Sequence, residues 1–172
     1  EARVFKPLRM TDTGFWVPLA KLDRVAEAFE KDPDGSASIK LLQVRYKPKY
    51  LAGGQGLVST AHDYLRFAQM LLDGGTFNGV RVLTAETAAR ITANGLPPEV
   101  LARRGGRMGW GLANVNVLMT ADGAGASVGE YGWDGTAGTI FWNDPVKQTV
   151  IVLMTQSAPA NPDGLRQKFK AL

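Results

Sequence analysis

The region from Trp110 to Thr155 most constrains the fold, because strand-like segments alternate there with turn-forming residues. Strand patterns are expected at 110–119, 127–133, 136–142 and 148–155. The connections between them, including turns at 120–125 and 143–145, are short. Parallel neighbours need a long crossover, so strands joined this closely pair antiparallel. The apolar run Val150–Met154 further predicts burial of the last strand on both faces.

Helical patterns dominate the preceding part of the chain. Two helices are expected at 61–73 and 85–93, where apolar residues recur at helical spacing. Thr60 and Thr84 can cap them, and Asp63 stands at the third position of a capping-box pattern after Thr60. Helices followed by an antiparallel meander predict an α+β fold, with helices flanking an antiparallel β-sheet.

The remaining segments give weaker patterns. Asn78-Gly79 predicts a short type I′ hairpin. Shorter helices are expected at 19–30 and after Gly164, and residues 1–9 resemble a helix end that Pro7 breaks. A turn is expected at 32–35, and loops are expected at 39–50 and 97–106.

Composition excludes several kinds of function. The 172 residues suffice for one domain with a core, and no apolar run approaches the length of a membrane span. The net charge of +4 is scattered, which argues against a nucleic-acid surface. The chain has no Cys and one His, and its Asp residues lie mostly in turns. We therefore expect no metal site, cofactor, disulfide or Cys nucleophile.

A serine nucleophile is also hard to place within this sequence. No Ser has Lys three residues later, and His62 lies in the first turn of an expected helix without a Ser partner. The remaining chemical signal is Gly135 and Gly138 within an expected strand region. Interior glycines mark either a β-bulge or the close approach of a ligand to the backbone, where an N–H can donate to an oxyanion.

Five segments complete the interpretation when taken together and in order. They are Pro7–Pro18, Gly53–Gly75, Arg81–Ile91, Met108–Val117 and Gly132–Pro145. In this order they resemble the carboxy-terminal half of the serine β-lactamase and penicillin-binding-protein-like hydrolases. The most similar branch is the class C-like one, which includes the family VIII carboxylesterases. The resemblance implies the carboxy-terminal part of a β-lactamase/transpeptidase-like fold.

The resemblance also implies roles for four consecutive residues. Trp133-Asp134-Gly135 resembles the third motif of the family, so Trp133 and Asp134 are expected to bind substrate. Gly135 and Thr136 are expected to be catalytic, with the Thr136 backbone N–H as one oxyanion donor. β-Lactamases carry Lys where Trp133 stands. Loss of that cation favours neutral esters over anionic β-lactams.

Two motifs of the family, Ser-x-x-Lys and Tyr-x-Asn, do not occur in this sequence. We therefore expect residues 1–172 to form a single partial domain, a carboxy-terminal fragment that is inactive alone. Its expected partners are the missing amino-terminal half of the same fold and a small ester or β-lactam-like substrate. The alternative is a non-catalytic, penicillin-binding-like module that binds a peptide or another protein.

Overall fold

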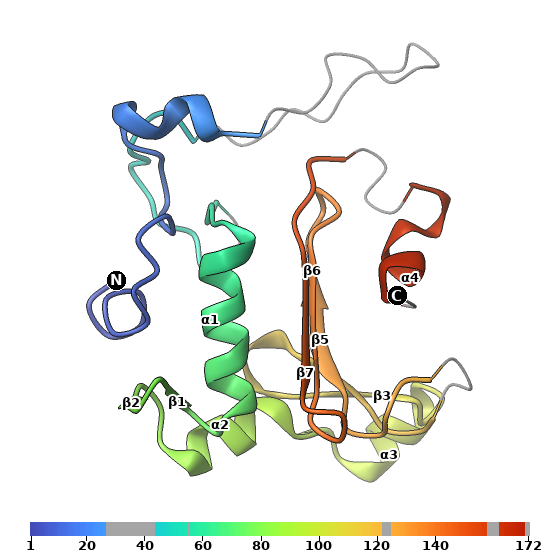
Figure 1. The fold of residues 1–172 in the computed structure, drawn as a ribbon. Helices are drawn as coiled ribbons and strands as arrows, with labels where there is room; N and C mark the ends of the chain where they lie inside the picture. Colours follow the sequence, from blue (N-terminus) through green and yellow to red (C-terminus); the bar gives the residue numbers. More distant parts are fainter. Residues whose placement is uncertain (27–43, 55, 122–124, 158–161, 171–172) are drawn as a thin grey trace. The chain divides into compact units, whose positions relative to one another are not determined.

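The computed structural model describes residues 1–26, 44–54, 56–121, 125–157 and 162–170 (Figure 1). The chain divides into two compact units. The first unit contains Glu1–Tyr64, Gly135–Thr139 and Leu153–Leu172, and the second contains Leu65–Asp134 and Ile140–Val152.

A five-stranded sheet follows the order of the chain, β3-β4-β5-β6-β7. The strands are β3 (Met108–Trp110), β4 (Asn116–Leu118), β5 (Tyr131–Asp134), β6 (Ile140–Asp144) and β7 (Thr149–Leu153). The pairings of β3 with β4, β4 with β5, and β5 with β6 are antiparallel. In Figure 1, β5, β6 and β7 run side by side. The predicted antiparallel meander is therefore confirmed.

The strand expected at 110–119 is wrong, because this segment folds back on itself. A 3-10 turn, Leu112–Asn114, separates β3 from β4 and contains Ala113 at φ 60°. The Gly111 N–H donates to the Val115 carbonyl at 2.8 Å, which closes the hairpin. A Cβ at Gly111 would lie 2.1 Å from the Ile91 carbonyl oxygen, so only glycine fits there.

Three other local expectations also need correction. The expected loop 97–106 contains helix α3 (Pro98–Arg103), because Pro98 and Glu99 favour a helix start. Asn143 and Asp144 end β6 and are not part of the turn. β7 is one of the two edge strands of the sheet among the described residues, and its four apolar residues are only half-buried. Val150–Met154 is therefore not buried on both faces.

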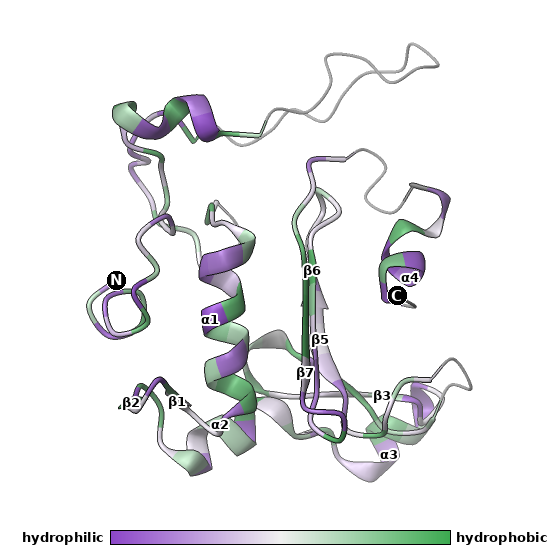
Figure 2. Cartoon of the chain, in the orientation of Figure 1, coloured by the Kyte–Doolittle hydropathy of each residue, from purple (hydrophilic) through white to green (hydrophobic). Residues whose placement is uncertain are grey.

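The two main helices form where their caps predict. Helix α1 (Ala61–Leu72) begins after Thr60, whose Oγ1 accepts the Asp63 N–H at 3.2 Å. Helix α2 (Ala85–Thr92) begins after Thr84, whose Oγ1 accepts the Thr87 N–H at 3.1 Å. Hydrophobic and hydrophilic bands alternate along α1 (Figure 2). This pattern fits a helix with one buried face.

Between these helices lies the short hairpin of β1 (Thr76–Phe77) and β2 (Val80–Arg81). Asn78 and Gly79 both have positive φ, 47° and 78°, as a type I′ turn requires. This turn prediction is confirmed.

The second unit is held together by a buried amide as well as by apolar packing. Asn143 on β6 is fully buried, and its Nδ2 donates to the Ala68 carbonyl at 2.7 Å and to Tyr131 Oη at 2.8 Å. One side chain thus joins α1, β5 and β6. Burial raises the pKa of Tyr131, which keeps its hydroxyl neutral. The buried apolar residues of this unit include Ala68, Met70, Leu71, Val117, Leu118, Ile140 and Phe141.

In the first unit, residues 1–9 form a series of turns and not the expected helix end. The Met10 N–H reaches the Phe5 carbonyl at 2.9 Å, and Arg9 adopts φ 53°, which no regular helix contains. The helix expected at 19–30 is a 3-10 helix, Leu19–Arg24. Its expected end at 27–30, the turn at 32–35 and part of the 39–50 loop lie outside the described residues, whereas 44–50 is irregular as expected. Helix α4 (Leu165–Lys170) confirms the expected final helix.

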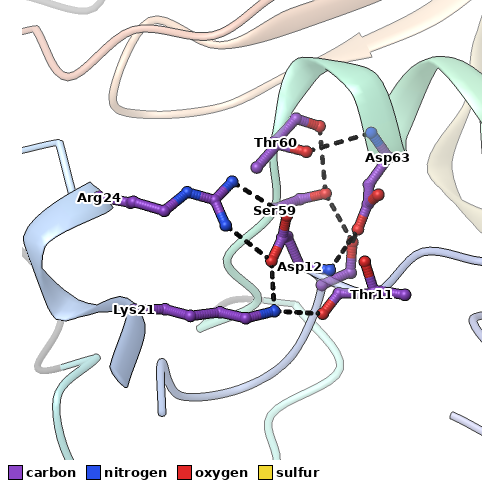
Figure 3. A network of polar contacts seen from close by, with 8 residues as sticks. Thr11, Asp12, Lys21, Arg24, Ser59, Thr60 and Asp63 are labelled. Carbon is purple, nitrogen blue, oxygen red and sulfur yellow. Dashed lines mark hydrogen bonds and ion pairs between the residues drawn. The ribbon is translucent and has the colours of Figure 1, made fainter. Parts of the chain in front are cut away.

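A polar network around Asp63 joins distant segments of the first unit (Figure 3). The Asp63 side chain is buried, and its Oδ2 accepts the Asp12 N–H at 2.7 Å and the Thr13 hydroxyl at 2.9 Å. The Asp12 carboxylate accepts hydrogen bonds from Lys21 at 2.5 Å and from Arg24 at 3.0 Å through both of its oxygens. Asp63 therefore serves tertiary structure in addition to its place in the first turn of α1.

The Asp12 ion pairs make stability depend on pH. Hydrogen bonds from Arg24 and Lys21 lower the pKa of Asp12 from 3.8 to about 2. A carboxyl with a lower pKa in the folded state stabilises the fold above its unfolded pKa, and this contribution is lost between about pH 4 and pH 2. We expect Asp12→Asn to lower the free energy of unfolding by up to about 1 kcal/mol at pH 7. The difference from wild type should shrink as the pH falls through this window.

Urea denaturation at a series of pH values measures this effect. Asp23→Asn is the matched control, because Asp23 is an exposed carboxylate on the 3-10 helix that carries Lys21 and Arg24 and should show little change. A difference between Asp12→Asn and wild type that is constant from pH 7 to pH 2 would contradict the assignment.

Candidate active site

The four residues expected to form the site lie at the end of β5 and in the turn that follows it. Trp133 and Asp134 are the last residues of β5, and both are exposed. Asp134 pairs with Ile140, so Gly135–Thr139 form the connection to β6. Gly135 and Thr136 therefore open a turn, and the expectation that Thr136 begins a strand is wrong.

The tight geometry of the connection accounts for both of its glycines. The Gly135 N–H donates to the Thr139 carbonyl at 2.8 Å, and the Gly138 N–H donates to the Gly135 carbonyl at 3.1 Å. Gly138 has φ 91°, which side chains disfavour. A Cβ on Gly135 would lie 2.2 Å from Thr139 Oγ1. The glycines close a turn, so the alternative of a bulge within a continuous strand does not apply.

The turn exposes a backbone donor at Thr136. Among the described residues, neither the Thr136 N–H nor the Ala137 N–H has a hydrogen-bond acceptor, and Thr136 is exposed. Buried backbone groups are almost always paired, so an unpaired N–H in a well-bonded turn is available to water or to a ligand. Such a donor can stabilise negative charge on a substrate oxygen.

Trp133 packs against a second aromatic ring within the second unit. Its ring centroid lies 5.2 Å from that of Trp110 on β3, with the planes at 76°, an edge-to-face arrangement. The Arg104 guanidinium carbon lies 5.6 Å from the centre of the Trp110 ring. Trp133 nevertheless remains 38% exposed. Its packing fixes the ring, and its exposed part offers an apolar surface.

Two side chains and one backbone N–H that hold the turn were not predicted from the sequence. Arg166 on α4 donates to the Gly135 carbonyl at 2.5 Å, Thr155 Oγ1 donates to the Ala137 carbonyl at 2.8 Å, and the Ser157 N–H donates to the same carbonyl at 3.0 Å. These donors lie 18–31 residues away in sequence and belong to the same unit as the turn. No local pattern connects them to the glycines, so a motif search does not find them.

Expectations from the sequence also concern His62, metal sites and membrane spans. His62 is exposed in the first turn of α1. Within the described ranges, no three His, Asp or Glu side chains come together in a way that could hold a metal ion. None of the helices in the described part of the chain is long and apolar enough to cross a membrane.

Comparison with known proteins relates this arrangement to a family. The family described as Beta-lactamase matches residues 1–172. The Mycobacterium tuberculosis protein Rv1367c is 31% identical over 175 aligned residues, which cover 92% of this chain and 43% of that protein.

Solved structures support the same fold. The structure of EstCE1, described as a hydrolase with promiscuous acyltransferase activity, has a TM-score of 0.77 at 22% identity and covers 99% of this chain and 48% of its own. Simvastatin synthase (LovD) from Aspergillus terreus has a TM-score of 0.76 at 18% identity, with coverages of 99% and 46%. The β-lactamase/transpeptidase-like α+β fold is thus confirmed. This chain spans less than half the length of each of these proteins.

The geometry of the turn makes a testable prediction about Gly135. Gly135→Ala should lower the free energy of unfolding by about 1–3 kcal/mol, because the new methyl group overlaps Thr139 Oγ1. The double variant Gly135→Ala with Thr139→Ala should recover most of this loss, since the clashing atom is then absent. Thermal and urea denaturation of the single and double variants measure the coupling.

Gly132→Ala on β5 is the matched control, because its methyl group would lie 2.1 Å from the Phe141 backbone carbonyl oxygen. No side-chain truncation can relieve that clash. Equal stability losses in the Gly135→Ala variant with and without Thr139→Ala would contradict the turn geometry.

Proposed function

Because this chain belongs to the Beta-lactamase family, we propose that it contributes the third motif and one oxyanion donor to a serine hydrolase. The single observation that carries this proposal is the Thr136 N–H, which is exposed and has no acceptor among the described residues, in a turn whose Gly135 and Ala137 carbonyls accept hydrogen bonds from distant residues. A preorganised N–H of this kind stabilises charge that develops on a carbonyl oxygen during acyl transfer.

The nucleophile in this proposal lies outside the present sequence. The chain contains Ser36, Ser38, Ser59, Ser127 and Ser157, and none is followed three residues later by Lys. The fact that the chain covers 43–48% of its relatives also supports a partner segment of similar size. We propose that the amino-terminal half of the fold supplies a serine and its base.

The proposed reaction forms and hydrolyses an acyl-enzyme. The serine Oγ attacks the substrate carbonyl carbon while its proton passes to the base, and the oxygen of the former double bond becomes an oxyanion. The Thr136 N–H donates to that oxyanion, and Gly135 allows the turn to present it. Collapse expels the alcohol or amine, which takes the proton from the base. Water then attacks the acyl group by the same steps in reverse, releasing the acid and the free serine.

Trp133 and Asp134 form the proposed substrate side of the motif. Trp133 stands two residues before Gly135 and offers an apolar, uncharged side chain, with no ammonium group to pair with a carboxylate substrate. This property supports neutral esters as the preferred substrate class over anionic β-lactams. No cofactor enters this mechanism.

The first test measures hydrolysis by the chain alone and after reassembly. We expect no turnover of nitrocefin or p-nitrophenyl butyrate above background by this chain, because an oxyanion donor without a nucleophile gives little catalysis. Addition of the polypeptide encoded immediately upstream, if it contains Ser-x-x-Lys, should produce activity. Substitution of that serine by alanine is the control.

The alternative function gives a different result. If the chain is a non-catalytic module, it should bind a peptide or another protein by itself. The polypeptide encoded upstream should then lack Ser-x-x-Lys, and adding it should produce no hydrolysis. Turnover by the isolated chain that survives repurification would instead contradict the requirement for a second segment.

The second test concerns Trp133. In the reassembled enzyme, Trp133→Ala should raise KM for p-nitrophenyl esters or lower kcat, for a loss in kcat/KM of roughly tenfold, as expected for removal of one aromatic contact. Trp16→Ala removes a side chain of equal size that packs with Lys47 in the other unit, and it is the matched control. Unchanged kinetics in Trp133→Ala would show that this residue serves packing alone.

A further inference from the structure

Four of the five carbonyl groups of the Gly135–Thr139 turn accept hydrogen bonds from the carboxy-terminal segment of the same unit. Arg166 donates to three of them, those of Gly135 at 2.5 Å and of Gly138 and Thr139 at 3.4 Å each. The Ala137 carbonyl accepts two further bonds from Thr155 and Ser157. The donors of the turn, by contrast, include the unpaired N–H groups noted above.

The strongest of these contacts acts on one peptide unit in particular. The Gly135 carbonyl and the Thr136 N–H belong to the same planar peptide group, in which a trans bond directs them to opposite sides. Any group that fixes the carbonyl therefore fixes the direction of the N–H. The Gly135 carbonyl accepts from Arg166 and from the Gly138 N–H, so this plane is held at two points.

A positive charge on the carbonyl side also changes the N–H itself. Hydrogen bonds to the carbonyl of an amide polarise the group and strengthen its N–H as a donor. Arginine suits this position, because its planar guanidinium presents five donors in a fixed fork, whereas lysine presents one flexible ammonium. Arg166 is partly buried on α4, which restricts the side chain to this neighbourhood.

We infer that Arg166 is a positioning residue that orients and polarises the Thr136 N–H through the shared Gly135–Thr136 peptide group. The effect of Arg166 on the Thr136 N–H concerns this chain alone. Its catalytic consequence rests on the proposed function, in which that N–H donates to the oxyanion.

The effect on the Thr136 N–H is tested by NMR on the intact chain, labelled with ¹⁵N. In Arg166→Ala we expect the Thr136 amide proton to shift upfield and its heteronuclear NOE to fall below that of β5, because the carbonyl loses its charged donor. Arg166→Lys should give an intermediate shift. Lys168→Ala, an exposed residue on the same helix, is the matched control and should leave Thr136 unchanged.

Resonances of α4 report whether the helix itself survives each substitution. An unchanged Thr136 amide in Arg166→Ala, with α4 intact, overturns the inference. If Arg166→Ala disrupts α4, Arg166→Lys decides the question, and an unchanged Thr136 amide in that variant has the same meaning.

The catalytic consequence is tested in the reassembled enzyme. Arg166→Ala should lower kcat for p-nitrophenyl butyrate by roughly 10- to 100-fold with a smaller change in KM, because the donor is misdirected in the transition state. Added guanidinium ion should restore part of kcat, which loss of packing alone would not allow. Wild-type kcat in this variant overturns the consequence. If the reassembled wild-type enzyme is itself inactive, the proposed function fails, while the NMR result still decides the role of Arg166.

Discussion

The antiparallel register of β5 and β6 is the constraint on which the candidate site depends. Pairing of Asp134 with Ile140 leaves only residues 135–139 to reverse the chain. So short a connection brings Thr139 Oγ1 into the space that a Cβ on Gly135 would occupy, and it places Gly138 at positive φ. Within this turn the Gly135 and Gly138 N–H groups donate to carbonyls of the turn itself, whereas the Thr136 N–H has no acceptor among the described residues.

The described structure stabilises each end of this hairpin in a different way. Toward the β6 end, the buried Asn143 amide joins β6 to Tyr131 and to the Ala68 carbonyl of α1. At the turn, Arg166 and Thr155 donate to backbone carbonyls within the first unit. Both arrangements satisfy backbone acceptors with side chains from distant parts of the sequence, and a buried acceptor left unpaired costs about 1–3 kcal/mol.

The features that the sequence predicted correctly share a local origin. Threonine caps, the Asn78-Gly79 turn and the order of the strands depend on residues a few positions apart. The failures have distant causes. The expected strand 110–119 is divided near Gly111, where the distant Ile91 carbonyl lies close to the backbone. Asn143 was expected in a turn, but it is a core residue that donates to the Ala68 carbonyl of α1. Asp63 combines both origins, since its N–H is capped locally while its carboxylate binds Asp12 and Thr13.

The difference between local and distant causes also applies to the Trp133-Asp134-Gly135-Thr136 motif. A sequence resemblance can locate Trp133 and Thr136, but it does not explain why a backbone N–H in this turn should be a strong donor. The structure provides a physical reason. The Gly135 carbonyl and the Thr136 N–H belong to one peptide group, and the Gly135 carbonyl oxygen lies 2.5 Å from the Arg166 guanidinium. A charged donor on one side of a peptide strengthens the donor on its other side. The quality of the proposed oxyanion donor therefore depends on a residue 31 positions away, as much as on the glycines that allow the turn to form.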